Sequence, residues 1–288
     1  MNPHFLMTDP CHFNVSYQIN PWMAPGAWTV AAAHAAVDGS RALRDAIITA
    51  GGSVEILPGV EGLPDLVFPA NAAVVLNGKV LTARFLCAER QGEEAVFRAV
   101  FDGLQARGIV GEVVELPDGV LQEGAGDAIW DIDRALFWVG HGQRSTKSSI
   151  AAIEETFGQK TVALELASPR FYHLDTCFCP LSGGKVMYYP PAFTAEALAT
   201  IRVNVAPQDC IEASDEEAGA FCVNAVNIDR TIIMAKAPEG LRRKLADYGY
   251  TLSEVDLASF ILSGGGAYCM TLRLDRTSQP DAGLRAAE

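Results

Sequence analysis

Short apolar runs recur along the chain, and most of them come in pairs separated by a turn. The turns fall at positions 77–78, 131–133, 182–185 and 227–229, which are rich in asparagine, aspartate and glycine. Paired apolar runs around such residues predict β-hairpins. A further run, at 266–274, has no second strand after it, and the N-terminal run 5–7 could supply its partner.

The first apolar run of each pair carries a polar residue at its end. These residues are Asn71, Glu123, His173, Asn224 and Cys269, spaced 45 to 52 residues apart, and Asn20 lies 51 residues before the first of them. A nearly constant period indicates one supersecondary unit used several times. The runs that carry these residues are expected to be strands, including the stretch from Phe171 to Leu181.

Helical spacing of apolar residues appears between the hairpins. The expected helices are 42–48, 93–107, 148–157, 195–201, 241–248 and 257–262, and the short strands expected to lead to the next unit are 52–57, 111–116 and 160–166. Glycine follows several of these helices, as is common at a helix C-terminus. The chain is therefore predicted to be an α/β protein in which five strand–hairpin–helix units close around a pseudo-axis. This five-bladed α/β propeller would form a single catalytic domain over 1–276, followed by a polar tail at 277–288.

Such a propeller would bring the recurring polar residues to one central cavity, where two of them suggest catalysis. His173 and Asp175 stand two apart, so on a strand both side chains leave by the same face, as a general base and its partner would. A histidine in an apolar strand can equally be a hydrogen-bonded core residue. Cys269 follows the glycine run Ser263–Gly266, which lets backbone approach a ligand closely. A thiol there fits covalent catalysis, and the alternative is a buried cysteine in a terminal strand.

Composition narrows the possible partners. Apolar residues make up 49% of the 288 and charged residues 20%, which allows a large core, and the net charge is −13. This charge disfavours nucleic acid or an anionic membrane as partner and suits a cationic substrate. The sequence has no apolar run of the ~18 residues that a membrane span needs. The N-terminus lacks the features of a signal peptide, so a cytoplasmic location is expected.

Seven cysteines, an odd number, are scattered along the chain, as expected for reduced thiols. The pair Cys177 and Cys179 has the wrong spacing for a zinc knuckle. No metal and no cofactor are therefore expected.

Three segments in order, 123–127, 173–176 and the glycine run that ends at Cys269, resemble the guanidino-group-modifying enzymes. This superfamily contains the arginine deiminases, the dimethylarginine dimethylaminohydrolases and the amidinotransferases, which share the five-bladed pentein propeller. The resemblance extends from Phe5 to about Leu274. The segments 8–23 and 173–181 look most similar to the bacterial arginine dihydrolases, which convert arginine to ornithine, ammonia and carbon dioxide.

The resemblance implies a role for each matching residue. Cys269 would be the nucleophile, His173 the acid and base, and Glu123 the carboxylate that holds the guanidinium. Asp127 and Asp175 would fix the loop and orient the histidine. Two arginines, Arg90 and Arg144, would clamp the α-carboxylate of the substrate, a role that suits the guanidinium fork. Asn20 and Asn224 are further candidates for the substrate site.

One position differs from the deiminases, which have an aspartate where this chain has Asn71. An amide both accepts and donates hydrogen bonds, so it could hold a ureido oxygen as well as a guanidinium nitrogen. Retention of the ureido product would permit a second attack, which is the dihydrolase outcome. A deiminase or dimethylaminohydrolase that gives citrulline, an amidinotransferase and a non-catalytic arginine-binding protein remain alternatives. The sequence leaves open a homo-oligomer and a lid at 21–37.

Overall fold

The computed structural model describes residues 2–279, and the strands in this range form five separate three-stranded sheets. In every sheet the middle strand pairs antiparallel with one neighbour and parallel with the other. The strands, sheet by sheet, are β1 (His4–Thr8), β2 (Ser53–Leu57) and β15 (Leu272–Arg273); β3 (Ala73–Leu76), β4 (Lys79–Thr82) and β5 (Glu112–Val114); β6 (Ala128–Asp131), β7 (Leu136–His141) and β8 (Lys160–Glu165); β9 (Phe178–Pro180), β10 (Val186–Tyr188) and β11 (Cys210–Glu212); β12 (Val226–Ile228), β13 (Thr231–Ala235) and β14 (Thr251–Val255).

The predicted hairpins are confirmed. Asn77 and Gly78 join β3 to β4 with φ angles of 53° and 75°, the left-handed conformation that an Asn-Gly hairpin turn requires. The N-terminal run also supplies the missing second strand of the last unit, because Phe5 in β1 pairs antiparallel with Arg273 in β15. The beginning and the end of the chain therefore share one sheet.

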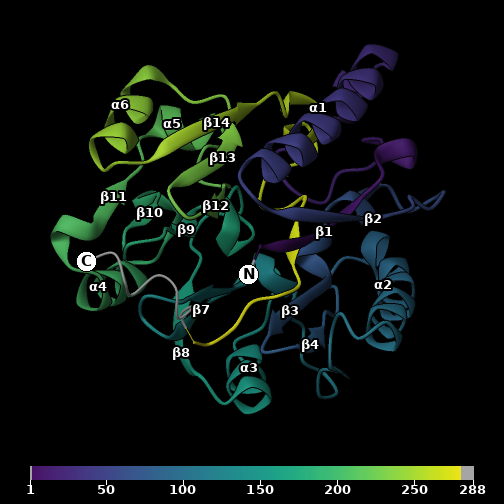
Figure 1. Cartoon of the computed structure of the whole chain (residues 1–288), viewed down its shortest axis with the longest axis horizontal. Coiled ribbons are helices and arrows are strands. Elements are labelled where there is room, and N and C mark those ends of the chain that lie inside the picture. Colours follow the sequence, from purple (N-terminus) through teal and green to yellow (C-terminus); the bar gives the residue numbers. More distant parts are fainter. Residues whose placement is uncertain (1, 280–288) are drawn as a thin grey trace.

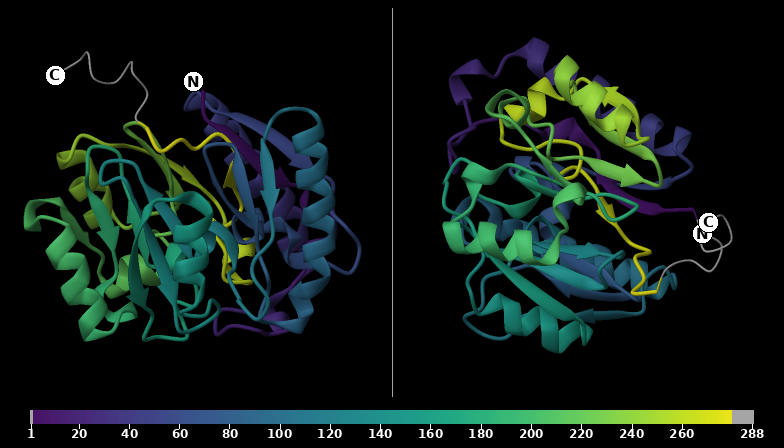
Figure 2. Two further views of the ribbon diagram at one scale, coloured as in Figure 1. Left: turned by 90° about the horizontal axis from the view of Figure 1, so that it is seen from below. Right: turned by 90° about the vertical axis from the view of Figure 1, so that its left-hand side faces the viewer.

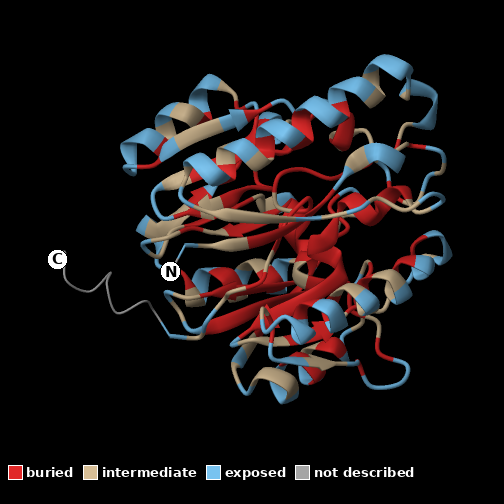
Figure 3. Ribbon diagram, turned by 45° about the vertical axis from the view of Figure 1, so that its right-hand side comes forward, coloured by how far each residue is buried: buried red, intermediate tan, exposed pale blue. Residues whose placement is uncertain are grey.

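Helices lie on the outside of the molecule and strands lie inside it (Figures 1 and 2). The helices are α1 (Val30–Thr49), α2 (Ala88–Ala106), α3 (Ser149–Phe157), α4 (Ala195–Asn204), α5 (Asp215–Gly219), α6 (Glu239–Asp247) and α7 (Ala258–Ile261). Colouring by burial shows the consequence, since the inner strands are buried and the outer faces of the helices are exposed (Figure 3). The predicted mixture of strands and helices is confirmed.

Helix α1 is much longer than the expected 42–48. It begins at Val30 because the Thr29 hydroxyl accepts a hydrogen bond from Ala32 N and caps the helix. The candidate lid at 21–37 is therefore not one loop, since its second half belongs to this helix.

The runs that carry the recurring polar residues were predicted as strands, and this prediction is wrong for the residues that precede β3, β6 and β9. They form 3-10 helices at Pro69–Ala72, Gly124–Gly126 and Leu174–Thr176. These turns approach one another closely. A Cβ atom on Gly124, whose φ is +63°, would lie 2.4 Å from the carbonyl oxygen of Ala70, so only glycine fits there. The recurring polar residues are thus carried by packed turns in front of the strands.

The expected polar tail at 277–288 lies mostly outside the described residues. Of its first residues, Ser278 exchanges two hydrogen bonds with the side chain of Asn77. Across residues 2–279, the helices are all too short or too polar to cross a membrane.

Candidate active site

His173 is the centre of a buried hydrogen-bond network. The residue precedes the 3-10 helix Leu174–Thr176 and is 1% exposed. Its Nε2 atom lies 2.6 Å from Oε2 of Glu123, and its Nδ1 atom lies 3.3 Å from Nδ2 of Asn71. Three of the turns that lead into hairpins therefore bring these three residues into contact, as their spacing predicted.

Glu123 holds the imidazole through an ionised carboxylate. Burial raises the pKa of Glu123, but the hydrogen bond and charge of His173 and the charges of Arg144 and Arg90 outweigh burial and lower this pKa to about 2. The Oε2 atom also accepts from Nη1 of Arg144 at 3.3 Å, and Oε1 accepts from the backbone N–H of Leu86. Both oxygens of Glu123 are thus engaged by the protein, whereas the sequence suggested contact with a substrate guanidinium.

Cys269 has its own polar partners. Its Sγ atom lies 3.1 Å from Oδ2 of Asp175, to which the thiol donates, and it accepts from Nδ2 of Asn224 at 3.0 Å. The Oδ1 atom of Asn224 in turn accepts from the backbone N–H groups of Tyr268 and Cys269. Burial and the negative charge of Asp175 raise the pKa of the thiol well above its usual value. A cation that enters this pocket would oppose that effect and favour the thiolate.

The thiol and the imidazole belong to one cluster. Asp175, which contacts the thiol, lies two residues after His173 in the same turn. The backbone N–H of Ala70, next to Asn71, donates to the carbonyl oxygen of Cys269. Asn224 also donates to the carbonyl oxygen of Asp175. The thiol of Cys269 and the imidazole of His173 are therefore linked through hydrogen bonds of neighbouring residues in one buried cluster.

Of the two aspartates near His173, Asp127 fixes the histidine turn as expected, whereas Asp175 does not orient the imidazole. Asp127 accepts from the backbone N–H of Leu174 and from the hydroxyl of Ser145, so it ties the histidine turn to the neighbouring unit. Asp175 contacts the thiol and not the imidazole. The reason is that residues 174–176 form a 3-10 helix, which does not place residues i and i+2 on one face as a strand does.

The two arginines are held by carboxylates. Arg90 forms a bidentate pair with Glu93 and donates to Oδ1 of Asn71. Arg144 donates to Glu123 and to the carbonyl oxygen of Ile19, and it stacks on the ring of Tyr172.

Asn20 lies in the irregular segment before α1 and organises it. Its Oδ1 atom accepts from the backbone N–H groups of Trp22 and Met23, and its Nδ2 atom donates to the carbonyl oxygen of Ser263. This contact joins the segment to the glycine run that precedes Cys269. Asn20 therefore lies at the edge of the site and ties together two segments far apart in the sequence.

Sequence reasoning did not single out two further residues. Glu93 holds Arg90, and buried Asp65 accepts from the hydroxyls of Tyr17 and Ser263. The position of Glu93 three residues after Arg90 on α2 was a usable signal, because i and i+3 neighbours meet on one helix face. Asp65 had no such signal, since its partners are distant in the sequence.

Asp175 is expected to destabilise the folded protein at neutral pH. Burial raises its pKa from 3.8 to about 7, and its Oδ1 atom has no protein hydrogen-bond partner in the described structure, although the residue lines a cavity of about 940 Å³. An acid with a raised pKa favours folding less and less as pH rises from its unfolded to its folded pKa. Asp175→Asn should therefore gain stability over wild type between pH 4 and 7, by on the order of 2–4 kcal/mol at pH 8.

Thermal unfolding of both proteins at pH 4.5 and pH 8 measures this difference. The gain should correspond to about 2–4 °C in Tm for each kcal/mol and should be much smaller at pH 4.5. An equal Tm difference at both pH values would show that Asp175 is not a buried titrating group.

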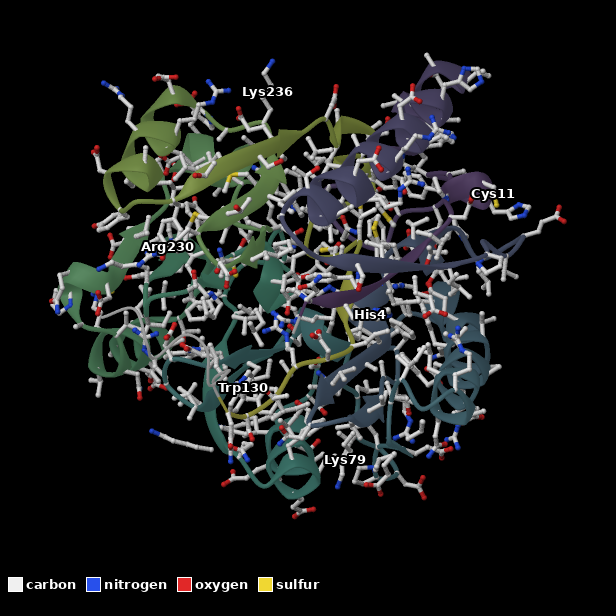
Figure 4. All side chains as sticks on the ribbon, in the orientation of Figure 1. His4, Cys11, Lys79, Trp130, Arg230 and Lys236 are labelled. Carbon is white, nitrogen blue, oxygen red and sulfur yellow. The ribbon has the colours of Figure 1, made fainter. Side chains whose placement is uncertain are left out.

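The other cysteines have different surroundings. Cys11 is exposed and lies at the outer edge of the molecule (Figure 4), whereas Cys177, Cys179 and Cys222 are buried. Burial raises the pKa of Cys179 and of Cys222 to about 12. Within the described residues, the hydrogen-bond partners of the Cys222 thiol are the carbonyl oxygens of Ala220 and Lys236. Cys269 differs from Cys222 in having a carboxylate and an amide as partners.

The thiol of Cys269 contacts a carboxylate and an amide, and the His173–Glu123 pair belongs to the same buried cluster. These are the groups that covalent catalysis by a cysteine needs. Fold and site thus define an α/β protein with a cysteine-based centre. Residues 24–276 match the profile of the family described as "N,N dimethylarginine dimethylhydrolase, eukaryotic", and the chain belongs to this family. The resemblance to guanidino-group-modifying enzymes is confirmed.

Relatives of known structure or name agree with this assignment. The chain is 41% identical to the bifunctional arginine dihydrolase/ornithine cyclodeaminase ArgZ of Synechocystis sp., over 96% of this chain and 38% of ArgZ. It is 32% identical to the N(G),N(G)-dimethylarginine dimethylaminohydrolase of Mycobacterium tuberculosis, over 94% of this chain and 85% of that protein. The N-terminal domain of an ArgZ variant, covalently bound to a reaction intermediate, matches with a TM-score of 0.91 and 38% identity, over 97% of this chain and all of that domain. The chain thus spans about two fifths of the bifunctional relative.

Proposed function

We propose that this protein is a cysteine-dependent hydrolase that attacks the guanidino carbon of arginine and acts as an arginine dihydrolase. The observation that carries the proposal is the contact of Cys269 with Asp175 and Asn224 beside the His173–Glu123 pair. The similarity to ArgZ over nearly the whole chain supports arginine as the substrate. We further propose that the five sheets close into a pentein propeller, with this site at its centre.

The first hydrolysis begins when the guanidinium of the substrate enters beside Cys269. Asp175, whose Oδ1 atom has no other protein partner in the described structure, accepts N–H groups of the substrate, and the cation favours the thiolate. The sulfur forms a bond to the guanidino carbon. His173 gives a proton to the departing nitrogen, which leaves as ammonia and leaves an S-amidino intermediate. A water molecule that gives its proton to His173 then attacks the carbon, the carbon–sulfur bond breaks, and a ureido product, citrulline, remains.

The second hydrolysis repeats this chemistry on the ureido carbon. The thiolate adds to the carbon, a second ammonia leaves, and water releases a carbamate that loses carbon dioxide to give ornithine. One arginine and two waters thus give ornithine, two ammonia and one carbon dioxide. Asn71, in contact with His173, is the residue that retains the ureido oxygen for this second attack. General acid–base help from His173 contributes about a hundred- to ten-thousandfold in each half.

Arg144 is the better candidate of the two arginines for the substrate α-carboxylate. It lies beside Ile19 in the segment before α1 and makes one long contact to Glu123. Four of the five N–H groups of Arg90, in contrast, already bind Glu93, Asn71 and the carbonyl oxygen of Asp65. We therefore propose that Arg144 binds the α-carboxylate of the substrate and that Arg90 has a different role.

Product analysis tests the function directly. Purified protein is incubated separately with arginine and with dimethylarginine, and ornithine, citrulline, ammonia and dimethylamine are quantified. We expect ornithine from arginine, with two ammonia for each arginine consumed. Citrulline as the only end product would identify a deiminase, and dimethylamine would identify a dimethylaminohydrolase, the activity named for the Mycobacterium tuberculosis relative. Binding of arginine without any product would leave a non-catalytic arginine-binding protein.

A further inference from the structure

The amide of Asn71 has a defined orientation, and Arg90 sets it. The Nη1 atom of Arg90 donates to Oδ1 of Asn71 at 2.8 Å. A guanidinium has only donors, so the amide oxygen must face Arg90 and the NH2 group must face the other way. That NH2 group lies 3.3 Å from Nδ1 of His173. Asn71 therefore presents its NH2 donors, and not its acceptor oxygen, to the imidazole of His173.

Arg90 is itself held in one place by Glu93. Its Nε and Nη2 atoms donate to the two carboxylate oxygens of Glu93 at 2.9 and 2.8 Å, and both side chains are buried. Its guanidinium also lies 4.5 Å from the centre of the Phe85 ring. A bidentate fork on one side and an aromatic ring on one face fix the plane of the guanidinium. The remaining nitrogen, Nη1, is thereby aimed at Asn71.

This orientation suits the second hydrolysis better than the first. The guanidinium of arginine offers only N–H donors, which have no acceptor to meet at an NH2 group. The ureido group formed by the first hydrolysis has an oxygen, and negative charge develops on it when the thiolate attacks. A donor already in place at such an oxygen stabilises the transition state, whereas an acceptor there would oppose it.

We propose that the buried Arg90–Glu93 pair orients the amide of Asn71 with its NH2 group toward the reacting carbon, and that it thereby determines whether hydrolysis continues beyond the ureido product. This inference rests on the proposed dihydrolase function and names the residues that control its outcome. Arg90 and Glu93 are positioning residues, because they act through Asn71. When the pair is broken, the amide is free to rotate, and citrulline leaves before the second attack.

The test is the ratio of citrulline to ornithine formed from arginine by a Glu93→Gln variant. Glutamine has nearly the same shape as glutamate but no charge. Its side chain has one acceptor oxygen, whereas the guanidinium of Arg90 donates to two oxygens of Glu93. We expect the ratio to rise at least about tenfold, since a well-placed oxyanion donor is worth about a hundredfold or more. The rate of arginine consumption should change much less than this ratio. Glu89→Gln is the control, because Glu89 is exposed on the same helix α2 and should leave the ratio unchanged.

Arg90→Lys provides a second route to the same result. Lysine keeps the charge but is a compact ammonium, which lacks the fork that holds Glu93 and reaches Asn71 at the same time. Its citrulline to ornithine ratio should rise as well. Circular dichroism and thermal unfolding show which variants are folded, and the ratio measured with a folded variant reports on the orientation of Asn71.

The outcomes separate this inference from the proposed function. Wild type that forms ornithine, together with folded variants of unchanged ratio, would overturn the inference alone. So would an equal loss of both hydrolyses, since that is what a purely structural role of the pair produces. Wild type that stops at citrulline would overturn the dihydrolase function and this inference together.

Discussion

Replacing Cys269 by serine is expected to abolish turnover of arginine and formation of a covalent adduct, while arginine still binds. The thiol becomes a strong nucleophile on losing a proton, and a serine hydroxyl has no comparable tendency to ionise. Loss of the nucleophile should lower kcat by on the order of 10⁴–10⁶. Binding should persist because Asp175, Asn224 and Arg144 remain in place.

Two measurements separate the expected effects. Intact-protein mass spectrometry during turnover should find the mass of an amidino adduct on wild type and none on Cys269→Ser. Isothermal titration calorimetry should find arginine bound to the variant. Cys222→Ser is the matched control, because its thiol is buried and its hydrogen bonds go to backbone carbonyl oxygens. It should keep both turnover and adduct. An adduct on Cys269→Ser would assign the nucleophile to another residue.

The repeating part of the fold was accessible from the sequence because hairpins depend on local chemistry. Short apolar runs on both sides of Asn77–Gly78 specify one hairpin, and a similar pattern recurs at the other hairpins. Phe5 pairs with Arg273, 268 residues further along the chain. This pairing was expected because the last unit had only one predicted strand of its hairpin and the N-terminal run could supply the second. Regular spacing therefore predicted which distant segments meet, without any information on side-chain positions.

The turns in front of the hairpins were not accessible in the same way. They are short and buried, and they lie in or beside apolar runs, which suits a short buried strand as well as a 3-10 helix. Tertiary packing decides between the two. Gly126 illustrates this effect of packing. A Cβ atom on Gly126 would lie 2.2 Å from Nδ2 of Asn71, because the two turns are packed directly against each other. No local pattern encodes that contact.

The sequence named the site residues more reliably than it named their partners. Asn71, Glu123 and His173 were expected to meet, and they do. Asp175 was expected to orient the imidazole, yet it contacts the thiol of Cys269. A hydrogen bond depends on side-chain direction within about an ångström, and a change from strand to 3-10 helix redirects a side chain completely. Residue spacing predicts which units meet, but the backbone conformation of each turn decides which atoms bond.

Replacing His173 by alanine is the second change with a large expected effect, because the imidazole acts in both halves of each hydrolysis. With arginine, kcat should fall by about a hundred- to ten-thousandfold, since neither the departing nitrogen nor the attacking water finds its proton partner. Binding of arginine should change little by comparison. The pKa of Glu123 should rise, because this buried carboxylate loses the hydrogen bond and the charge that oppose desolvation.

A substrate analogue with a thiol leaving group distinguishes chemistry from misfolding. Such a group departs without a proton from His173, so the first attack by Cys269 should proceed in His173→Ala and give a covalent adduct detectable by mass spectrometry. That adduct should then persist, because the water that would release it lacks its base. Rapid release of the adduct, or near-normal turnover of arginine, would remove His173 from the mechanism. A stable adduct in a variant that cannot turn over arginine would show that His173 protonates the departing nitrogen and activates the water that releases the adduct.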